Sequence, residues 1–188
     1  MRQIASFIVT AALSLALGLP WPAEAGESTE VELARAASGP GQIAIIVGAT
    51  ALPLLSNEED AANEAWRTAD GIVSAWLIAQ GVQQIVHAER PDGSSDDSFP
   101  SGHATAAFAA ATMAADYKPH QAPYWYSAAA LIAWSRVRLK RHRTEDVIAG
   151  ALLGFGVAKL EQSLPRGLLL SPFIDADGGG GVKAVWQF

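Results

Sequence analysis

Cysteine is missing from this chain, and no lysine occurs before Lys118. Without cysteine, the protein has no disulfide bonds and no thiolate metal sites. Aromatic residues make up only 8% of the sequence and long β-branched runs are scarce, whereas alanine is abundant. This composition favours helices over a large sheet. A formal net charge of -6 argues against nucleic acid as a partner.

The N-terminal segment has the pattern of an export signal. Arg2 precedes an apolar stretch over residues 4–19, Pro20 breaks it, and Ala23 and Ala25 are small residues at the two positions that a signal peptidase reads. We therefore expect a signal peptide over residues 1–25 and a periplasmic location. The alternative is an uncleaved anchor in the inner membrane, since this stretch is long for a signal core and short for a span.

The rest of the chain alternates apolar runs with turn signals. Residues 26–42 are polar and are predicted to form a linker, which is followed by one helical domain over residues 43–164. None of its apolar runs reaches the 18 residues typical of a membrane-spanning helix. We expect an all-α bundle of about five core helices, over residues 43–55, 61–87, 103–117, 124–139 and 145–164.

Two segments carry finer patterns. The second expected helix has an apolar stripe made of Trp66, Ile72, Trp76, Ile78, Val82 and Ile85. The C-terminal residues 165–188 are predicted to form a short β-hairpin or tail that packs on the bundle, with one face made of Val182, Ala184, Trp186 and Phe188.

The motif Pro100-Ser101-Gly102-His103 precedes an alanine-rich helical run. Ser101 is suited to cap that helix, and Gly102 lets an anion approach the free N–H groups of the first turn. A cationic His103 in this turn meets an unfavourable helix dipole unless an anion is bound beside it. The motif therefore predicts a phosphate site in which His103 donates a proton to the leaving oxygen.

A second motif places Arg136 six residues before His142 and Asp146 four residues after it. The last two can meet, and a carboxylate that accepts the hydrogen of one ring nitrogen leaves the other nitrogen free to attack. Arg136 closes an apolar helix, where a buried guanidinium needs an anion. Thr144 is a candidate N-cap for the helix that follows. The alternatives are a surface His–Asp pair and a solvated basic face.

Arg90-Pro91 lies upstream of both motifs. Pro91 ends the preceding helix and fixes the direction of Arg90. Asp96 and Asp97 are expected to be solvated loop acids. We expect no metal at them, because a histidine mechanism of phosphoryl transfer needs no cation.

Together the three motifs resemble the signature of the type 2 phosphatidic acid phosphatase and vanadium haloperoxidase superfamily. They cover residues 90–146, and the helices around them extend the likeness to about residues 43–163. The resemblance implies that His142 attacks phosphorus and becomes a phosphohistidine, that Asp146 orients it, and that His103 protonates the leaving group. It also implies that the phosphoryl oxygens are held by Arg90, Arg136, Ser101 and the Gly102 amide. No cofactor is implied for phosphatase action, and vanadate can mimic phosphate.

One position departs from the family pattern. The family places a lysine seven positions before the arginine of the first motif, and this chain has Gln83 there. Gln83 can donate a hydrogen bond to a phosphoryl oxygen, so we include it in the expected phosphate site, but it carries no charge. The lost charge is expected to cost about 2 kcal/mol of transition-state binding. His87, one helical turn on, either compensates for that charge or is a partly buried structural histidine.

Three functions fit these residues. The first is a metal-independent phosphatase acting on a small phosphomonoester or on a lipid phosphate, such as a (lyso)phospholipid or a polyprenyl-type phosphate, with a membrane surface as a further partner. The second is a non-catalytic envelope protein that binds phosphate or phospholipid, which the glutamine at position 83 keeps open. The third is a vanadium-dependent haloperoxidase. Oligomeric state is not indicated by the sequence.

Overall fold

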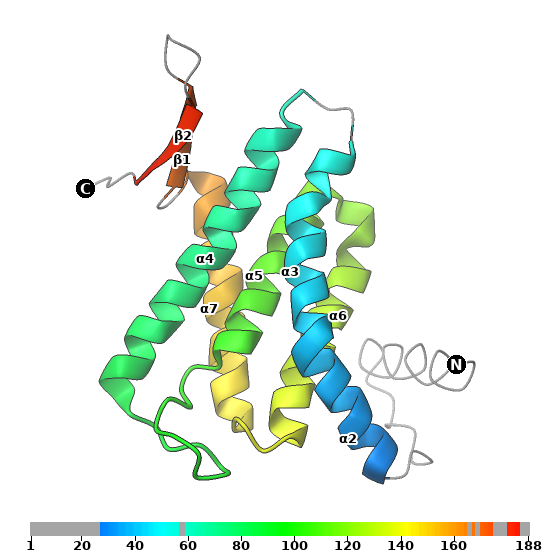
Figure 1. Cartoon of the computed structure of the whole chain (residues 1–188), viewed down its shortest axis with the longest axis vertical. Helices are drawn as coiled ribbons and strands as arrows, with labels where there is room; N and C mark the ends of the chain where they lie inside the picture. The colour runs from blue at the N-terminus through cyan, green and yellow to red at the C-terminus, as the bar shows by residue number, and fades with distance from the viewer. Residues whose placement is uncertain (1–26, 57–58, 165–166, 168–169, 175–179, 185–188) are drawn as a thin grey trace.

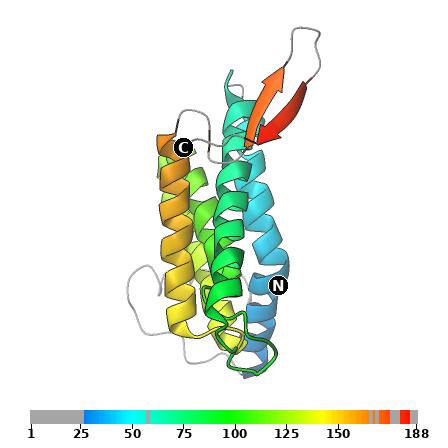
Figure 2. The ribbon, with the colours of Figure 1, turned by 90° about the vertical axis from the view of Figure 1, so that its left-hand side faces the viewer.

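The computed structural model describes residues 27–56, 59–164, 167, 170–174 and 180–184 (Figure 1). Most of them belong to long helices that run side by side along one axis (Figures 1 and 2). These are α2 (Glu27–Ala36), which continues through η1 (Ala37–Gly41) into α3 (Gln42–Ala51), then α4 (Ala61–Val86), α5 (Gly102–Tyr117), α6 (Ala122–Arg138) and α7 (Thr144–Ser163). Two short 3₁₀ turns, η2 (Pro53–Leu55) and η3 (Pro119–Gln121), lie between them. The all-α bundle is confirmed.

The segment expected to be a polar linker is helical instead. α2 passes into α3 through η1, a π-helical turn that contains Pro40. The flanking residues Ala36 and Gly41 keep right-handed helical angles, with φ of -63° at both. Proline removes a helical hydrogen bond and clashes with the previous turn in an α-helix. The wider π turn accommodates it, so the glycines and the proline do not end the helix.

Helix α5 lies at the centre of the bundle, in contact with α3, α4, α6 and α7. Its side chains are small, and alanine supplies most of its buried positions. Small side chains on every face let four neighbouring helices approach one axis closely. The high alanine content of the sequence is thus concentrated where the core is most crowded.

Two glycines set the distance between α5 and α7. A Cβ atom on Gly150 would lie 2.5 Å from the carbonyl oxygen of Ser101, and one on Gly154 would lie 2.1 Å from that of Thr105. Real Cβ atoms do not come so close, so only glycine fits at these positions without a backbone shift. The two helices that begin at the predicted motifs are therefore in backbone contact.

The apolar stripe expected on α4 is not its buried face. Ile72 is 5% exposed, but Trp66, Trp76, Ile78 and Ile85 are exposed. The buried face consists mainly of small or polar residues, namely Ala65, Thr68, Asp70, Gly71, Ile72, Ser74, Ala75, Ala79 and Gln83. No helix in the described part of the chain is both long enough and apolar enough to cross a membrane.

The C-terminal region contains two short strands. β1 (Leu170–Ile174) pairs antiparallel with β2 (Gly180–Ala184), with Pro172 opposite Val182. They lie at the opposite end of the bundle from the loop that joins α4 to α5 (Figures 1 and 2). The predicted face with Trp186 and Phe188 lies outside the described residues. A hairpin over residues 165–188 that packs on the bundle therefore stays a prediction.

Candidate active site

The three sequence motifs meet at one end of the bundle. A pocket of about 480 Å³ lies there, formed by α3, α4, the α4–α5 loop and the start of α5, together with His142 just before α7. Its lining consists of Gln42, Ile46, Ile72, Val73, Trp76, Gln80, Gln83, Arg90, Asp97, Gly102, His103, Ala106 and His142. Five predicted site residues are among these, whereas Ser101, Arg136 and Asp146 do not line the pocket.

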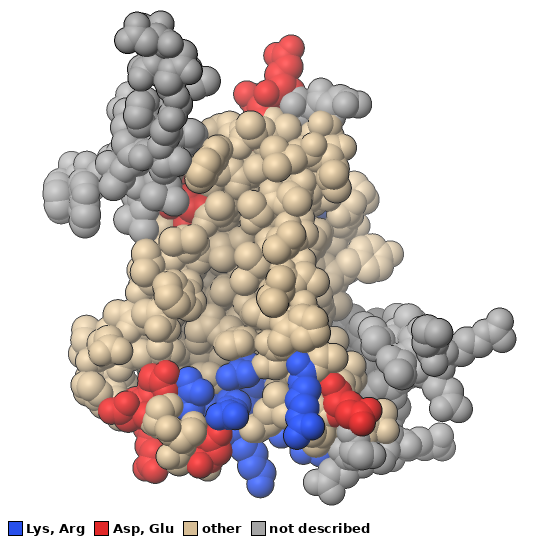
Figure 3. Space-filling model, in the orientation of Figure 1, with Lys and Arg blue, Asp and Glu red and all other residues tan. Residues whose placement is uncertain are grey.

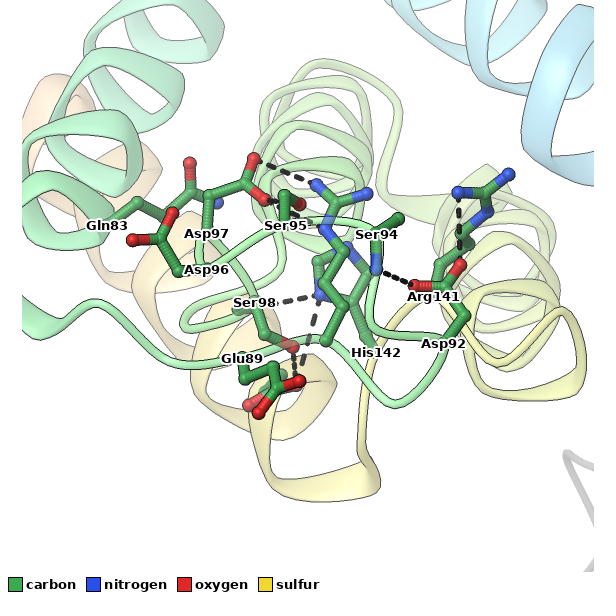
Figure 4. A network of polar contacts seen from close by, with 12 residues as sticks. Gln83, Glu89, Asp92, Ser94, Ser95, Asp96, Asp97, Ser98, Arg141 and His142 are labelled. Atoms are coloured by element: carbon green, nitrogen blue, oxygen red, sulfur yellow. Dashed lines mark hydrogen bonds and ion pairs between the residues drawn. The ribbon is translucent and has the colours of Figure 1, made fainter.

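His142 is held in one orientation by the α4–α5 loop. Its side chain is 2% exposed, and its Nδ1 lies 2.8 Å from the carbonyl oxygen of Ser98 (Figure 4). A carbonyl oxygen can only accept, so Nδ1 must carry the hydrogen, and Nε2 of the neutral ring is left with a lone pair. This is the tautomer that a nucleophilic histidine needs.

Asp146 does not make the direct hydrogen bond to His142 that the sequence predicted. Its Oδ2 lies 3.9 Å from Nδ1 of His142, beyond hydrogen-bond distance. The same oxygen instead accepts hydrogen bonds from the hydroxyl of Ser98 and, at 2.8 Å, from the backbone N–H of Arg143. Ser98 therefore stands between the carboxylate and the imidazole, with its hydroxyl toward one and its carbonyl toward the other.

Ser98 was missed by sequence reasoning. It is fully buried, and its own N–H donates to the carbonyl of Ala88 at 2.8 Å. The only sequence signal was a serine close before the Pro100–His103 motif. The N-cap of α7 also differs from the expectation: the helix begins at Thr144, and Arg143 is the capping position, with its N–H bound by the Asp146 carboxylate.

Ser101 caps α5, as predicted. Its Oγ accepts from the N–H of Ala104 at 3.4 Å, and its own N–H donates to the carbonyl of Asp146 at 2.9 Å. Ser101 is fully buried, so it stabilises the first turn of α5 without lining the pocket itself. Gly102 and His103 of the same turn reach the pocket.

Both pocket histidines are neutral near pH 7. The pKa of His103 is lowered from 6.5 to about 4, mainly by burial and to a smaller extent by the nearby positive charges of Arg136 and Arg90. Burial also lowers the pKa of His142 to about 4, partly opposed by its hydrogen bond to Ser98. Arg90 in the pocket wall and Arg136 behind it thus disfavour the charged form of both histidines, and a bound anion would raise both pKa values again.

Arg136 is buried behind the pocket, at the last turn of α6. It is 8% exposed, its Nη1 donates to the hydroxyl of Ser38 in η1, and its Nε has no hydrogen-bond partner among the described residues. Burial lowers the pKa of Arg136 to about 10, with a further contribution from the charges of Arg90 and Arg141. The guanidinium remains charged, and no carboxylate in the described residues pairs with it at short range.

Arg90 already has an anionic partner. Its Nη2 donates to Oδ2 of Asp97 at 2.9 Å, and its Nε lies 2.9 Å from the other carboxylate oxygen. A hydrogen bond from Ser95 lowers the pKa of Asp97, and Arg90 lowers it further. The prediction that Asp97 is a solvated loop acid is therefore wrong, because its carboxylate binds Arg90 at the wall of the pocket.

Gln83 reaches the pocket wall from the last turns of α4. It is buried, and its Nε2 donates to the carbonyl of Pro100 at 2.8 Å. One of its two N–H groups is thus committed to the α4–α5 loop. His87 does not replace the missing charge: it is exposed and faces Asp96 at 3.2 Å, outside the pocket lining.

Charged side chains gather at this end of the molecule. In Figure 3, Lys, Arg, Asp and Glu cluster at the lower end, and the broad surface above them carries few charges. Arg141 pairs with Asp92 at 3.0 Å, and Arg138 pairs with Glu30 of α2 at 2.9 Å. Among the described residues, no group of three or more histidine, cysteine, aspartate or glutamate side chains is arranged to hold a metal ion.

Comparison with known proteins identifies the family. The model of the PAP2 superfamily matches residues 5–166, which is most of the chain. The chain belongs to the PAP2 superfamily. The matched residues include all three sequence motifs that meet at the pocket.

Two individual PAP2 comparisons add detail. Lipid A 1-phosphatase of Porphyromonas gingivalis is 37% identical to this chain over 75 residues, which are 38% of this chain and 17% of that protein. This chain therefore matches only a small part of that relative. The crystal structure of LpxE from Aquifex aeolicus has a TM-score of 0.58, covers 73% of this chain and 86% of its own, and is 19% identical. It shows a shared fold.

Proposed function

We propose that this PAP2 protein is a metal-independent phosphatase that removes phosphate from a phosphorylated lipid or a related phosphomonoester. The observation that carries the proposal is the pocket in which a neutral His142, with a free Nε2, shares one wall with His103 and Arg90. The buried charge of Arg136 lies behind it. Phosphoryl transfer needs positioning and positive charge around the transferred group more than covalent chemistry, and this arrangement supplies both.

The reaction has two steps. In the first, Nε2 of His142 attacks phosphorus in line, the bond to the leaving oxygen breaks, and His103 gives a proton to that oxygen. In the second, His103 takes a proton from water, the water oxygen attacks the phosphohistidine, and inorganic phosphate leaves with His142 restored. Each step uses one histidine as nucleophile or leaving group and the other as acid or base.

The protonation of His103 depends on the substrate. Alone, His103 has a pKa of about 4 and is neutral near pH 7. A phosphate dianion bound beside it favours the imidazolium form, so the substrate itself supplies the condition for proton donation. Activity in mildly acidic solution follows from this pairing.

A lipid substrate is supported by the apolar part of the site. Ile46, Ile72, Val73 and Ala106 line the pocket beside the charged groups. Outside it, α3 and α4 carry exposed apolar side chains, including Ile43, Val47, Leu77 and Ile78. We propose that this face rests on a membrane surface while the phosphate enters the pocket. We further propose export by residues 1–25 to the periplasm, which N-terminal sequencing of the processed protein tests.

The decisive experiment measures phosphate release by the purified full chain, with chelator present, from p-nitrophenyl phosphate and from a panel of lipid phosphates. Release that survives the chelator and is lost in His142→Ala supports the proposal. Trapping with ³²P-labelled substrate, followed by alkaline gel analysis, detects an acid-labile, base-stable phosphohistidine in wild-type protein and none in the variant. A folded wild-type protein that releases no phosphate from any substrate refutes the proposal and favours a phosphate-binding module.

A further inference from the structure

The two arginines of the site have partners of different charge. Arg90 forms an ion pair with the carboxylate of Asp97. Arg136 is 8% exposed, and its Nη1 donates to the hydroxyl of Ser38, which is a neutral group. A buried guanidinium is usually paired with a carboxylate or another anion. In the described part of the chain, the charge of Arg90 is therefore balanced, whereas that of Arg136 is not.

The unbalanced charge of Arg136 acts on the pocket. Burial is the main cause of the lowered pKa of His103 and of His142, and among the two arginines Arg136 lowers each pKa more than Arg90 does. The Nε of Arg136 is also buried without an acceptor among the described residues. Both charge and hydrogen-bonding capacity are thus left for an anion that enters the pocket.

Ser38 comes from a segment that precedes all three motifs. It lies in η1, and both α2 and η1 contact α6, which ends at Arg138. Ala34, four residues before Ser38 and on the same side of the helix, is fully buried. The ion pair between Glu30 and Arg138, at 2.9 Å, joins the same two helices. The packing of α2 and η1 on α6 therefore fixes the place at which the Ser38 hydroxyl meets Arg136.

A hydroxyl holds a guanidinium without neutralising it. A carboxylate at the same place would form a charge-assisted hydrogen bond, which is roughly twice as strong as a neutral one, but it would compete with phosphate for the same positive charge. A methyl group would leave the guanidinium without this acceptor and with one more buried donor unsatisfied. A serine at position 38 thus combines a fixed arginine with a charge that stays available.

We propose that Ser38 is a positioning residue for phosphoryl transfer: its hydroxyl fixes Arg136 behind the pocket and, being neutral, leaves the guanidinium charge for the bound phosphate. The inference rests on the proposed phosphatase function, in which positive charge surrounds the transferred group. It adds α2 and η1 to the part of the chain that forms the active site. It also requires stability and activity to respond in opposite directions to a negative charge at position 38.

The test measures kcat/KM for p-nitrophenyl phosphate, inhibition by inorganic phosphate and thermal melts in variants of Ser38. Ser38→Asp is expected to melt at or above the wild-type temperature, because the new carboxylate pairs with Arg136. Its kcat/KM is expected to fall about 100-fold, and phosphate is expected to inhibit it about tenfold more weakly. Ser38→Ala is expected to lose about tenfold in kcat/KM, whereas Ser38→Thr, which keeps the hydroxyl, stays within about twofold of wild type.

Two controls show that the effect is specific to this contact. Gly39→Ala, in the same turn and with open space around its Cβ, is expected to keep the wild-type kcat/KM. In an Arg136→Ala background, Ser38→Ala is expected to cause no further loss in single-turnover rate, because Ser38 acts through the arginine.

Two outcomes overturn the proposal. One is a Ser38→Asp variant that melts at or above wild type and keeps the wild-type kcat/KM and phosphate inhibition. The other is a loss in Ser38→Ala that is equally large in the Arg136→Ala background, and this cycle decides alone if Ser38→Asp does not fold. If wild-type protein hydrolyses no substrate, the phosphatase proposal fails by itself. Calorimetric titration with inorganic phosphate then decides: weaker binding in Ser38→Asp and wild-type binding in Ser38→Thr support the proposal, and equal or absent binding refutes it.

Discussion

Replacing Ser98 by alanine tests how Asp146 acts on the nucleophile. The change removes one hydroxyl but keeps both backbone hydrogen bonds, from the Ser98 N–H to Ala88 and from His142 to the Ser98 carbonyl. Asp146 loses the hydrogen bond from Ser98 and retains the one from the Arg143 N–H at 2.8 Å. A hydrogen bond to a buried charged group contributes about 1.5–3 kcal/mol, so the free energy of unfolding is expected to fall by about 2 kcal/mol.

The kinetic effect is expected in kcat. Ser98 does not line the pocket, so substrate binding and KM are expected to stay the same. The imidazole of His142 keeps its hydrogen bond to the carbonyl of residue 98, but that carbonyl is no longer tied to Asp146 through the Ser98 hydroxyl. A loss of about 2 kcal/mol in transition-state stabilisation corresponds to roughly a thirtyfold lower kcat. Steady-state kinetics with p-nitrophenyl phosphate between pH 5 and pH 8, together with thermal melts, measures both effects. Ser95→Ala, in the same loop but bonded to Asp97, is the control.

A double-mutant cycle distinguishes an effect of Asp146 that acts through Ser98 from a direct contact between Asp146 and His142. If Asp146 acts through Ser98, the double variant with Asp146→Asn has nearly the same kcat as Asp146→Asn alone, because the two residues share one function. Additive losses, or an unchanged kcat in Ser98→Ala while Asp146→Asn is inactive, would refute the reasoning. Either result would mean that the 3.9 Å gap between Asp146 and His142 closes during the reaction.

Three further predictions concern packing, charge and pH. Gly154→Ala is expected to lower the free energy of unfolding, measured by urea titration, by about 3 kcal/mol, because its Cβ would lie 2.1 Å from a backbone oxygen. The control Gly156→Ala has open space around its Cβ and is expected to be neutral or slightly stabilising in the same titration. Asp97→Asn removes the carboxylate that competes for Arg90, so inorganic phosphate is expected to inhibit the variant about tenfold more tightly; weaker inhibition would show that Asp97 positions Arg90 for phosphate. The pKa of His142 is about 4 in the folded protein, below its ordinary 6.5, so the unfolded chain binds a proton first as the pH falls. The contribution of His142 to the free energy of unfolding is therefore complete above pH 6.5, and about 3 kcal/mol of it is lost by pH 4. Thermal melts at pH 7 and pH 4.5 should show a smaller loss in His142→Asn than in wild type.

Much of the helical architecture follows from local sequence signals. The helices α4 to α7 start and end close to the predicted residues, because caps and turn residues act over a few positions, as at Ser101. The helix over residues 27–41 was missed because Gly39-Pro40-Gly41 is typical of a loop, and the packing of this turn against α6 is a long-range contact that local sequence does not show. The buried face of α4 was also misjudged, since small residues are buried against the alanines of α5.

The chemical groups of the site could be predicted, but not all of their partners. His103, His142 and Arg90 come together as expected. Two contacts could not be foreseen, because they join residues far apart in the sequence: Arg136 with Ser38, 98 residues away, and Asp146 with Ser98, 48 residues away. Neither serine belongs to a motif, and only the fold brings them to the site.

The π-helical turn η1 has a consequence for how this chain tolerates insertions and deletions. Ser38, within the turn, contacts Arg136, and Gln42, just after it, lines the pocket. Each residue of an α-helix turns the chain by about 100°, so deleting a single residue from Ala37–Gly41 would rotate everything before it relative to α3. The ion pair between Glu30 and Arg138 would then be lost, together with the hydrogen bond between Ser38 and Arg136. Natural relatives that lack one residue here are therefore expected to hold the buried arginine by a different group.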